Sequence, residues 1–399
     1  MKALALTALL LLTTLAGCNT PTPEPGSLAD FERFRKDGTG RDADGWPRLN
    51  GTITILDNGA FADDAFTAAA RQFELLTGVE VKREEGEDAG RALNKLTTAS
   101  PGQYDVIYGI DNALLGRAIR LGVLERYTAQ MANRVAPAYR FDTTGYATPV
   151  DHGYVAINVD EAGAPGVNTL AEVRAHAEKF VTQDPRTSSP GLAFLLVTVA
   201  KYGEEQPGSP GAYSWKSYWR DLFTGRDTDR DQDGDVAGCV LVTPDWTSAY
   251  EQHFSGGYGP SNGGAGDYPI VTSYTESPAY EHFYGRERDD LATVVLEDNA
   301  TWHQIQTMAI VKGTDNRPAA QAWIEFTLTD FFQELAAPHD AVYPVVEGIE
   351  VASTYKGVDP SPGSFRPARI QRATIDANLE RWLKEWTALY EDTALNCRL

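Results

Sequence analysis

Acidic and aromatic side chains stand at several points of the sequence where a loop is predicted to meet a helix or a strand. The acidic candidates are Asp88, Asp111 and Asp151, and the aromatic candidates are Tyr154, Trp246, Tyr274 and Tyr280. Carboxylates accept hydrogen bonds from amino groups, and an aromatic face attracts a cation by ~0.5–2 kcal/mol. These residue types favour recognition of a small organic cation. The structural alternatives are core packing for each aromatic ring, helix capping for Asp111 and strand positioning for Asp151.

Two Ser-Pro pairs predict helix N-termini. Ser188 and Ser189 precede Pro190, and Ser277 precedes Pro278; a serine before a proline is typical of a helix start. The N-terminus of a helix exposes unpaired N–H groups and the positive end of the helix dipole, which suits a phosphate or another anion. The three serines are therefore candidates for ligand contacts, with plain capping as the alternative.

Charge and motifs argue against catalysis and against nucleic acid. The formal net charge of −21 repels phosphate backbones and weakly favours a cationic ligand, although solubility alone also explains it. The sequence contains no Cys-x-x-Cys, His-Glu-x-x-His, Gly-x-Ser-x-Gly or Walker pattern. We expect a binding protein, not an enzyme, with no nucleic-acid partner and no organic cofactor.

One aspartate-rich segment resembles a calcium loop. Its alternating carboxylates are Asp229, Asp231, Asp233 and Asp235, with Gly234 at the turn. Such a pattern can wrap a hard cation, but Val240 stands where an EF-hand loop needs a bidentate glutamate. A structural Ca²⁺ is one interpretation, and a solvated acidic loop is the other.

The first 50 residues predict export and tethering. Met1-Lys2 is followed by a short apolar run ending in Leu15-Ala-Gly-Cys18, which resembles a bacterial lipoprotein signal; residues 1–18 would be the signal peptide and lipobox, and Cys18 would carry the lipid. An ordinary signal with a chance cysteine is the alternative. Residues 19–50 are rich in proline, glycine and charge and predict a flexible tether. Cys239 and Cys397 then remain as a pair that an extracytoplasmic setting could oxidise.

The rest of the chain alternates predicted strands and helices, which indicates an α/β fold with parallel sheets. Strands are predicted at 51–56, 79–81, 104–108, 148–159, 269–274, 290–296 and 304–311. Helices are predicted at 62–76, 89–98, 112–121, 170–180, 192–202, 215–223, 247–254, 318–335 and 370–390. About 350 residues exceed one usual core, so we expect two lobes: 51–150 begins the first, 151–292 forms the second, and 293–399 returns to the first and adds the C-terminal helices.

Several segments, in order, resemble the thiamine-binding periplasmic proteins of thiamine ABC importers, which have the class II, iron-binding-protein-like periplasmic binding fold. The matching segments are Glu87-Asp88, Gly109-Ile-Asp-Asn-Ala-Leu-Leu115, Asp151-His-Gly-Tyr-Val-Ala156, Gln183-Asp-Pro-Arg-Thr-Ser-Ser-Pro-Gly-Leu192, Ser273-Tyr-Thr-Glu-Ser-Pro-Ala-Tyr280 and Tyr343-Pro344. The resemblance implies two α/β lobes joined by crossover strands, with a ligand cleft between them. It also implies a monomer that binds thiamine or its phosphates outside the cytoplasm and delivers them to a membrane permease.

The resemblance assigns contacts and also shows departures. It places ligand contacts at Asp88, Ser188, Trp246, Tyr274 and Tyr280. Ala89 stands where the family usually has glycine, and Ala341 stands where it has a stacking tryptophan. The family has a second tryptophan near the position of Ala65–Phe66 and a loop tyrosine near the position of Leu56–Asn58, and this chain has neither the tryptophan nor the tyrosine there. The residues considered as substitutes are Phe61, Phe66 and Trp302.

Three alternatives remain open at this point. Another organic cation such as a polyamine would need more carboxylates in the cleft and fewer stacking rings. A sensor domain of a surface receptor could share the fold. An enzyme on this scaffold would need a nucleophile–base pair, which the motifs do not reveal. The absence of a Tyr-Tyr pair argues against ferric iron.

Overall fold

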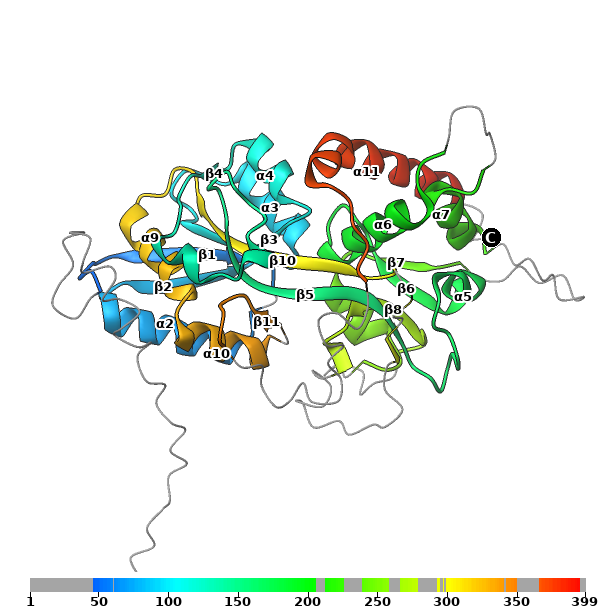
Figure 1. Cartoon of the computed structure of the whole chain (residues 1–399), viewed down its shortest axis with the longest axis horizontal. Helices are drawn as coiled ribbons and strands as arrows, with labels where there is room; N and C mark the ends of the chain where they lie inside the picture. Colours follow the sequence, from blue (N-terminus) through cyan, green and yellow to red (C-terminus); the bar gives the residue numbers. More distant parts are fainter. Residues whose placement is uncertain are drawn as a thin grey trace, which may run out of the picture.

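The computed structural model describes residues 46–59, 61–205, 212–225, 239–257, 266–278, 293–294, 297, 299–340, 342–349 and 366–394. Its elements form two groups, called here the first and the second lobe, and two long strands run between them (Figure 1). Among these residues, no helix has both the length and the apolar character that crossing a bilayer requires.

The first lobe begins with strand–helix alternation. Before the crossover, its elements are β1 (Thr52–Asp57), α2 (Asp63–Thr77), β2 (Glu80–Glu85), α3 (Ala89–Thr98), β3 (Val106–Asp111), α4 (Leu115–Leu121) and β4 (Leu124–Glu125). β1 pairs in parallel with both β2 and β3. Both faces of this sheet are covered, because α2 lies on one side and α3 and α4 on the other (Figure 1). Such two-sided cover is the reason that all six residues of β3 are buried.

The crossover is an antiparallel pair. β5 (Thr148–Val159) and β10 (Trp302–Val311) run side by side from one lobe to the other (Figure 1). All twelve residues of β5 are buried. The register places Gln306 opposite Asp151 and Trp302 opposite Val155.

The second lobe contains the middle of the chain. Its elements are α5 (Leu170–Ala175), η3 (Ala177–Lys179), β6 (Phe180–Gln183), α6 (Ser189–Tyr202), α7 (Trp215–Thr224), β7 (Leu241–Thr243), η4 (Ser248–His253) and β8 (Ile270–Tyr274). β6 pairs in parallel with β7 and with β8. α6 is apolar on every side and is buried over most of its length, between the sheet and α7.

The remaining elements complete both lobes. They are η1 (Gln130–Arg134), η2 (Pro137–Tyr139), β9 (Thr293–Val294), α9 (Arg317–Thr327), α10 (Asp330–His339), β11 (Tyr343–Pro344) and α11 (Arg372–Ala394). The sheet runs without a break through both lobes in the order β2-β1-β3-β10-β5-β8-β6-β7. α11 packs on α7, where the ring centroids of Trp219 and Trp386 lie 5.5 Å apart. The C-terminal helix therefore covers the second lobe (Figure 1).

Three of the predicted helices differ in kind or in extent from the structure. The helix predicted at 170–180 ends early, and Phe180–Gln183 forms β6. The helix predicted at 318–335 is two helices, because Thr329 accepts a hydrogen bond from the Phe332 N–H and starts α10. The segment predicted as a helix at 247–254 is a π-helix, η4.

Candidate ligand-binding site

A cavity of about 170 Å³ lies between the two lobes. Its described lining from the first lobe is Asn58, Gly59, Glu87, Asp88 and Asp340. Its described lining from the second lobe is Trp246, Thr247, Glu251, Tyr274, Glu276 and Ser277. Asn58 follows β1, and Glu276 and Ser277 follow β8, so the cavity lies at the carboxyl ends of strands, where α/β sheets usually bind ligands.

Asp88 stands where the two lobes meet. It is the N-cap residue of α3, and its Oδ1 atom accepts a hydrogen bond of 2.7 Å from the Ala89 N–H. The same atom accepts one of 2.8 Å from the Ser189 N–H, at the start of α6 in the second lobe. A carboxylate between two helix N-termini neutralises the positive ends of both dipoles. Ser188 is the N-cap residue of α6, as the Ser-Pro pattern predicts.

The lobes are in close contact beside Asp88. A Cβ atom added at Gly90 would lie 2.6 Å from the carbonyl oxygen of Thr187, which a side chain could not tolerate. Arg91 forms an ion pair with Glu87 and lies 4.0 Å from the carboxylate of Asp245. Glu87 itself has φ of 70°, in the left-handed region that a side chain other than glycine seldom adopts. Such strain is often held at binding sites.

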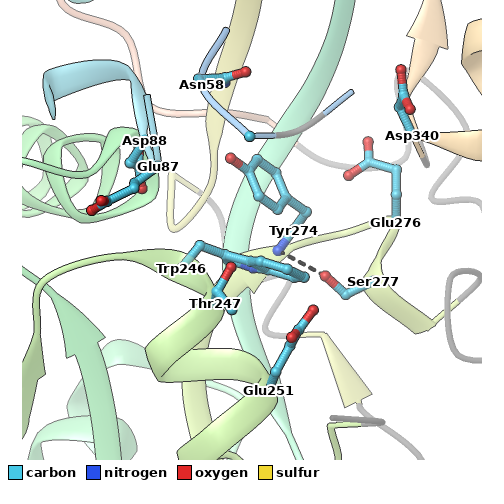
Figure 2. Close-up of a pocket in the computed structure, with 11 residues that line it drawn as sticks. Asn58, Glu87, Asp88, Trp246, Thr247, Glu251, Tyr274, Glu276, Ser277 and Asp340 are labelled. Carbon is cyan, nitrogen blue, oxygen red and sulfur yellow. Dashed lines mark hydrogen bonds between the residues drawn. The ribbon is translucent and has the colours of Figure 1, made fainter. Parts of the chain in front are cut away.

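Two aromatic rings form one wall of the cavity (Figure 2). The Trp246 ring stacks on Tyr250, with centroids 4.8 Å apart and planes at 11°, and its Nε1 donates to Ser273 Oγ at 2.8 Å. Tyr274 ends β8, and its backbone N–H donates to Ser277 Oγ at 3.2 Å. The packing against Tyr250 and the hydrogen bond to Ser273 hold the indole in place, so the cavity is lined by a fixed aromatic ring.

The cavity is acidic. Five of its described lining residues carry carboxylates, and none of the described lining residues is a lysine or an arginine. Burial raises the pKa of Asp88 to about 7, although hydrogen bonds from Ser189, Ser188 and Ala89 oppose the shift. Burial also raises the pKa of Glu251. A bound cation would offset the cost of ionising these groups away from water.

Six of the predicted site residues that the structure describes do not line the cavity, namely Ala89, Asp111, Asp151, Tyr154, Ser188 and Ser189. Asp111 accepts from the N–H groups of Ala113 and Leu114 and from Gln304, so it caps the turn into α4. Asp151 accepts from the Tyr108 hydroxyl and from Gln306 Nε2, so it braces the crossover. These are the structural alternatives considered for both aspartates.

Tyr154 and Ala89 have packing roles in the structure. The Tyr154 ring stacks on His303, with centroids 4.7 Å apart, and only 8% of the residue is exposed. Ala89 is completely buried in the first turn of α3. The three substitutes considered for the lost family aromatics also lie in the core: Phe61, Phe66 and Trp302 are at most 9% exposed and do not line the cavity.

Several predicted positions lie outside the described residues. They are Cys18, Tyr280, Ala341 and Cys397, together with the candidate calcium ligands Asp229, Asp231, Asp233 and Asp235. Cys239 is disulfide-bonded, and its predicted partner Cys397 is among those outside. The described lining also includes residues that the sequence did not single out, namely Asn58, Gly59, Glu87, Thr247, Glu251, Glu276 and Asp340. Glu87 and Glu276 stand inside segments that carry the family resemblance, and that position was the signal that could have found them.

Comparison with known proteins agrees with this arrangement. Residues 68–356 match the family described as bacterial extracellular solute-binding protein. The thiamine-binding periplasmic protein of Escherichia coli K12 is 26% identical over 84% of this chain and 92% of its own length. A solved periplasmic thiamin-binding protein superposes with a TM-score of 0.68 at 23% identity, covering 88% of this chain and 98% of that one. The ferric-binding protein from Campylobacter jejuni superposes with a TM-score of 0.61 at 15% identity, covering 84% of this chain and 99% of that one.

The chain belongs to the bacterial extracellular solute-binding proteins. Its fold is that of the periplasmic binding proteins of the ferric- and thiamine-binding type, with two α/β lobes joined by crossover strands. It is a substrate-binding protein of the ABC-importer type, which acts outside the cytoplasm and delivers a small molecule to a permease. It is not an enzyme.

Proposed function

We propose that the ligand is thiamine or a thiamine phosphate. The observation that carries the proposal is the cavity between the lobes, where the Trp246 and Tyr274 rings stand beside Asp88, Glu251, Glu276 and Asp340. Thiamine combines a flat aminopyrimidine with a permanently cationic thiazolium ring. An aromatic wall attracts such a cation, and carboxylates complement its charge. Relatives that carry the name thiamine-binding periplasmic protein support the same ligand.

A linear polyamine is the second candidate, and the distribution of carboxylates favours it. Glu87 and Asp88 lie on one side of the cavity, and Glu276 and Asp340 lie on the other (Figure 2). A chain with an ammonium group at each end could satisfy both sides. Thiamine remains the first candidate because Trp246 offers a rigid, stacked ring that a flexible chain would use less well.

Isothermal titration calorimetry distinguishes the two candidates. Thiamine, thiamine monophosphate, thiamine diphosphate, putrescine and spermidine are each titrated into the purified domain. We expect thiamine or one of its phosphates to bind far more tightly than either amine. Tighter binding of spermidine would replace thiamine by the second candidate, and no binding of any thiamine form below millimolar concentration would end the assignment.

We also propose that Cys18 anchors the protein to the membrane and that the protein works as a monomer. The proposal rests on the Leu15-Ala-Gly-Cys18 sequence and on the proline-rich segment after it. Cells that express the whole chain are labelled with a radioactive fatty acid. We expect labelled protein in the membrane fraction, and unlabelled, released protein for the Cys18→Ala variant. Equal labelling of the wild type and the Cys18→Ala variant would exclude this anchor. Analytical ultracentrifugation of the domain tests whether it is a monomer.

A further inference from the structure

Two acidic residues from different lobes lie against one short stretch of the crossover strand β5. Glu276 is 1% exposed, and its Oε1 atom accepts a hydrogen bond of 3.2 Å from the Tyr154 N–H. Asp340 follows α10, and its charge interacts with that of Asp151, three residues earlier in β5. Both side chains line the cavity on the side away from Glu87 and Asp88 (Figure 2).

Asp340 has one carboxyl oxygen to offer a ligand. Its Oδ1 atom accepts a hydrogen bond of 2.7 Å from the Ala62 N–H, which fixes the side chain. Its Oδ2 atom exposes less than 1 Å² to solvent and has no hydrogen-bond partner. A buried acceptor without a donor is costly, and proteins keep one mainly where a ligand or a water completes it. The position of Asp340 in the cavity wall favours a ligand.

The protonation of Asp340 adds a second capability. Burial and the neighbouring charges of Asp151 and Asp57 raise its pKa well above the ordinary value, and the opposing effect of Arg83 is smaller. A raised pKa favours the protonated carboxyl group, which donates one hydrogen bond and accepts another. The edge of an amino-substituted heteroaromatic ring offers the complementary pair, an N–H donor beside a ring nitrogen acceptor.

We propose that Asp340, with Glu276 beside the same segment of β5, forms a subsite that recognises the amino-substituted edge of a heteroaromatic ring. On the proposed function, from which this inference takes its ligand, that edge is the aminopyrimidine of thiamine. Asp340 then determines specificity at one end of the cavity, and Trp246 with the carboxylates of the other side receives the thiazolium end.

Oxythiamine provides the test, because it replaces the amino group of thiamine by a carbonyl oxygen and changes a donor into an acceptor. Wild type should bind thiamine about tenfold to 100-fold more tightly than oxythiamine, the cost of a mismatched buried polar pair. Asp340→Asn keeps an oxygen for the Ala62 N–H and presents an amide N–H₂ to the ring. Asp340→Asn should weaken thiamine binding, and it should lower or reverse the ratio of thiamine affinity to oxythiamine affinity. Glu276→Gln should also weaken thiamine binding.

Glu334→Gln is the control, since it makes the same carboxyl-to-amide change at an exposed position of α10 that does not line the cavity. It should leave the ratio of the two affinities unchanged, and thermal unfolding checks that all three variants fold. If wild type binds thiamine and oxythiamine equally, or if Asp340→Asn keeps the wild-type ratio, the subsite is refuted while thiamine binding stands. If wild type binds spermidine and neither thiamine nor oxythiamine, the proposed function and the ring-edge subsite both fail.

Discussion

The carboxylate of Asp88 in the first lobe and the backbone N–H of Ser189 in the second lobe are joined by a hydrogen bond of 2.8 Å. The same carboxylate caps α3 through the Ala89 N–H, so one side chain connects the first turns of two helices on opposite sides of the cleft. The structure is therefore closed at this point. A solute-binding protein works by closing its lobes around a ligand, and we expect Asp88 to stabilise the closed form.

Replacing Asp88 tests this link. Asp88→Ala removes both hydrogen bonds, and because bonds to a charged group contribute about 1.5–3 kcal/mol, ligand affinity should fall about tenfold to 100-fold. Small-angle scattering should also show a larger radius of gyration with ligand present than wild type shows. Asp88→Asn keeps an oxygen acceptor and should lie between the two. An affinity equal to wild type in Asp88→Ala would mean that closure does not depend on this residue.

Gly90 makes a second prediction about closure. A methyl group at this position would meet the Thr187 carbonyl oxygen of the other lobe only when the lobes are closed. Gly90→Ala should therefore lower affinity about tenfold or more, by the usual cost of overpacking, while α3 itself becomes a better helix. Calorimetry and thermal unfolding measure the two effects. Thr97→Ala, at an exposed position of the same helix, should also improve the helix but should leave ligand affinity unchanged. A Gly90→Ala protein with wild-type affinity would contradict the close approach.

Affinity for a cationic ligand should rise with pH through about 7. Burial raises the pKa of Asp88 to about 7, with Asp245 adding to the shift, and Tyr274 and Glu87 also face this part of the cavity. Below that pH the unliganded carboxyl is protonated, and a bound cation favours its ionised form, so binding releases a proton. Affinity should increase by up to about tenfold per pH unit below 7 and level off above it.

Calorimetry in buffers of different ionisation enthalpy counts the released proton directly. The Asp88→Asn protein lacks the titrating group and should show a flatter profile over the same range. A wild-type affinity that is constant from pH 5.5 to 8, or that falls as the pH rises, would contradict this assignment of Asp88.

Trp246 should stabilise the bound ligand, and its fluorescence should change when the ligand binds. Its ring is held by Tyr250 and by the hydrogen bond to Ser273, and it lines the cavity. Trp246→Ala should weaken binding of a cationic ligand about tenfold or more, because both the cation–π attraction and the apolar contact are lost. Trp246→Phe keeps an aromatic face and should lose less. Ligand-induced quenching of tryptophan fluorescence should also shrink in both variants. If Trp246→Ala, Trp246→Phe and wild type bind the ligand with equal affinity, Trp246 only packs against Tyr250.

Local sequence patterns predicted most of the fold correctly. The alternation in 51–56 and the apolar run in 148–159 are β1 and β5, and the helical spacing in 89–98 is α3. These features depend on neighbours a few residues apart, so a single sequence carries them. The errors lie where local and tertiary preferences differ. The helix predicted at 170–180 ends early, because Phe180 begins β6, which pairs with β7 and β8.

The candidate site was predicted only in part. Asp88, Trp246, Tyr274 and Ser277 line the cavity, and their residue types at loop–helix junctions pointed to them. Asp111 and Asp151 have the same residue type, yet their hydrogen bonds turn them toward a helix start and the crossover. No spacing in the sequence distinguishes a carboxylate that faces a cleft from one that caps a turn, because the difference depends on distant partners.

The sequence by itself determined that a helix begins at Ala89, that another begins at Ser188–Pro190, and that both belong to an α/β binding-protein fold. Capping and periodicity are short-range properties, so they can be recognised before the chain is folded. Only the tertiary structure decided that the Ser189 N–H meets the Asp88 carboxylate and that Glu276 and Asp340 line one cavity. These pairs are separated by 101 residues in the first case and by more than sixty in the second, and only the closing of two lobes about β5 and β10 brings such distant segments together.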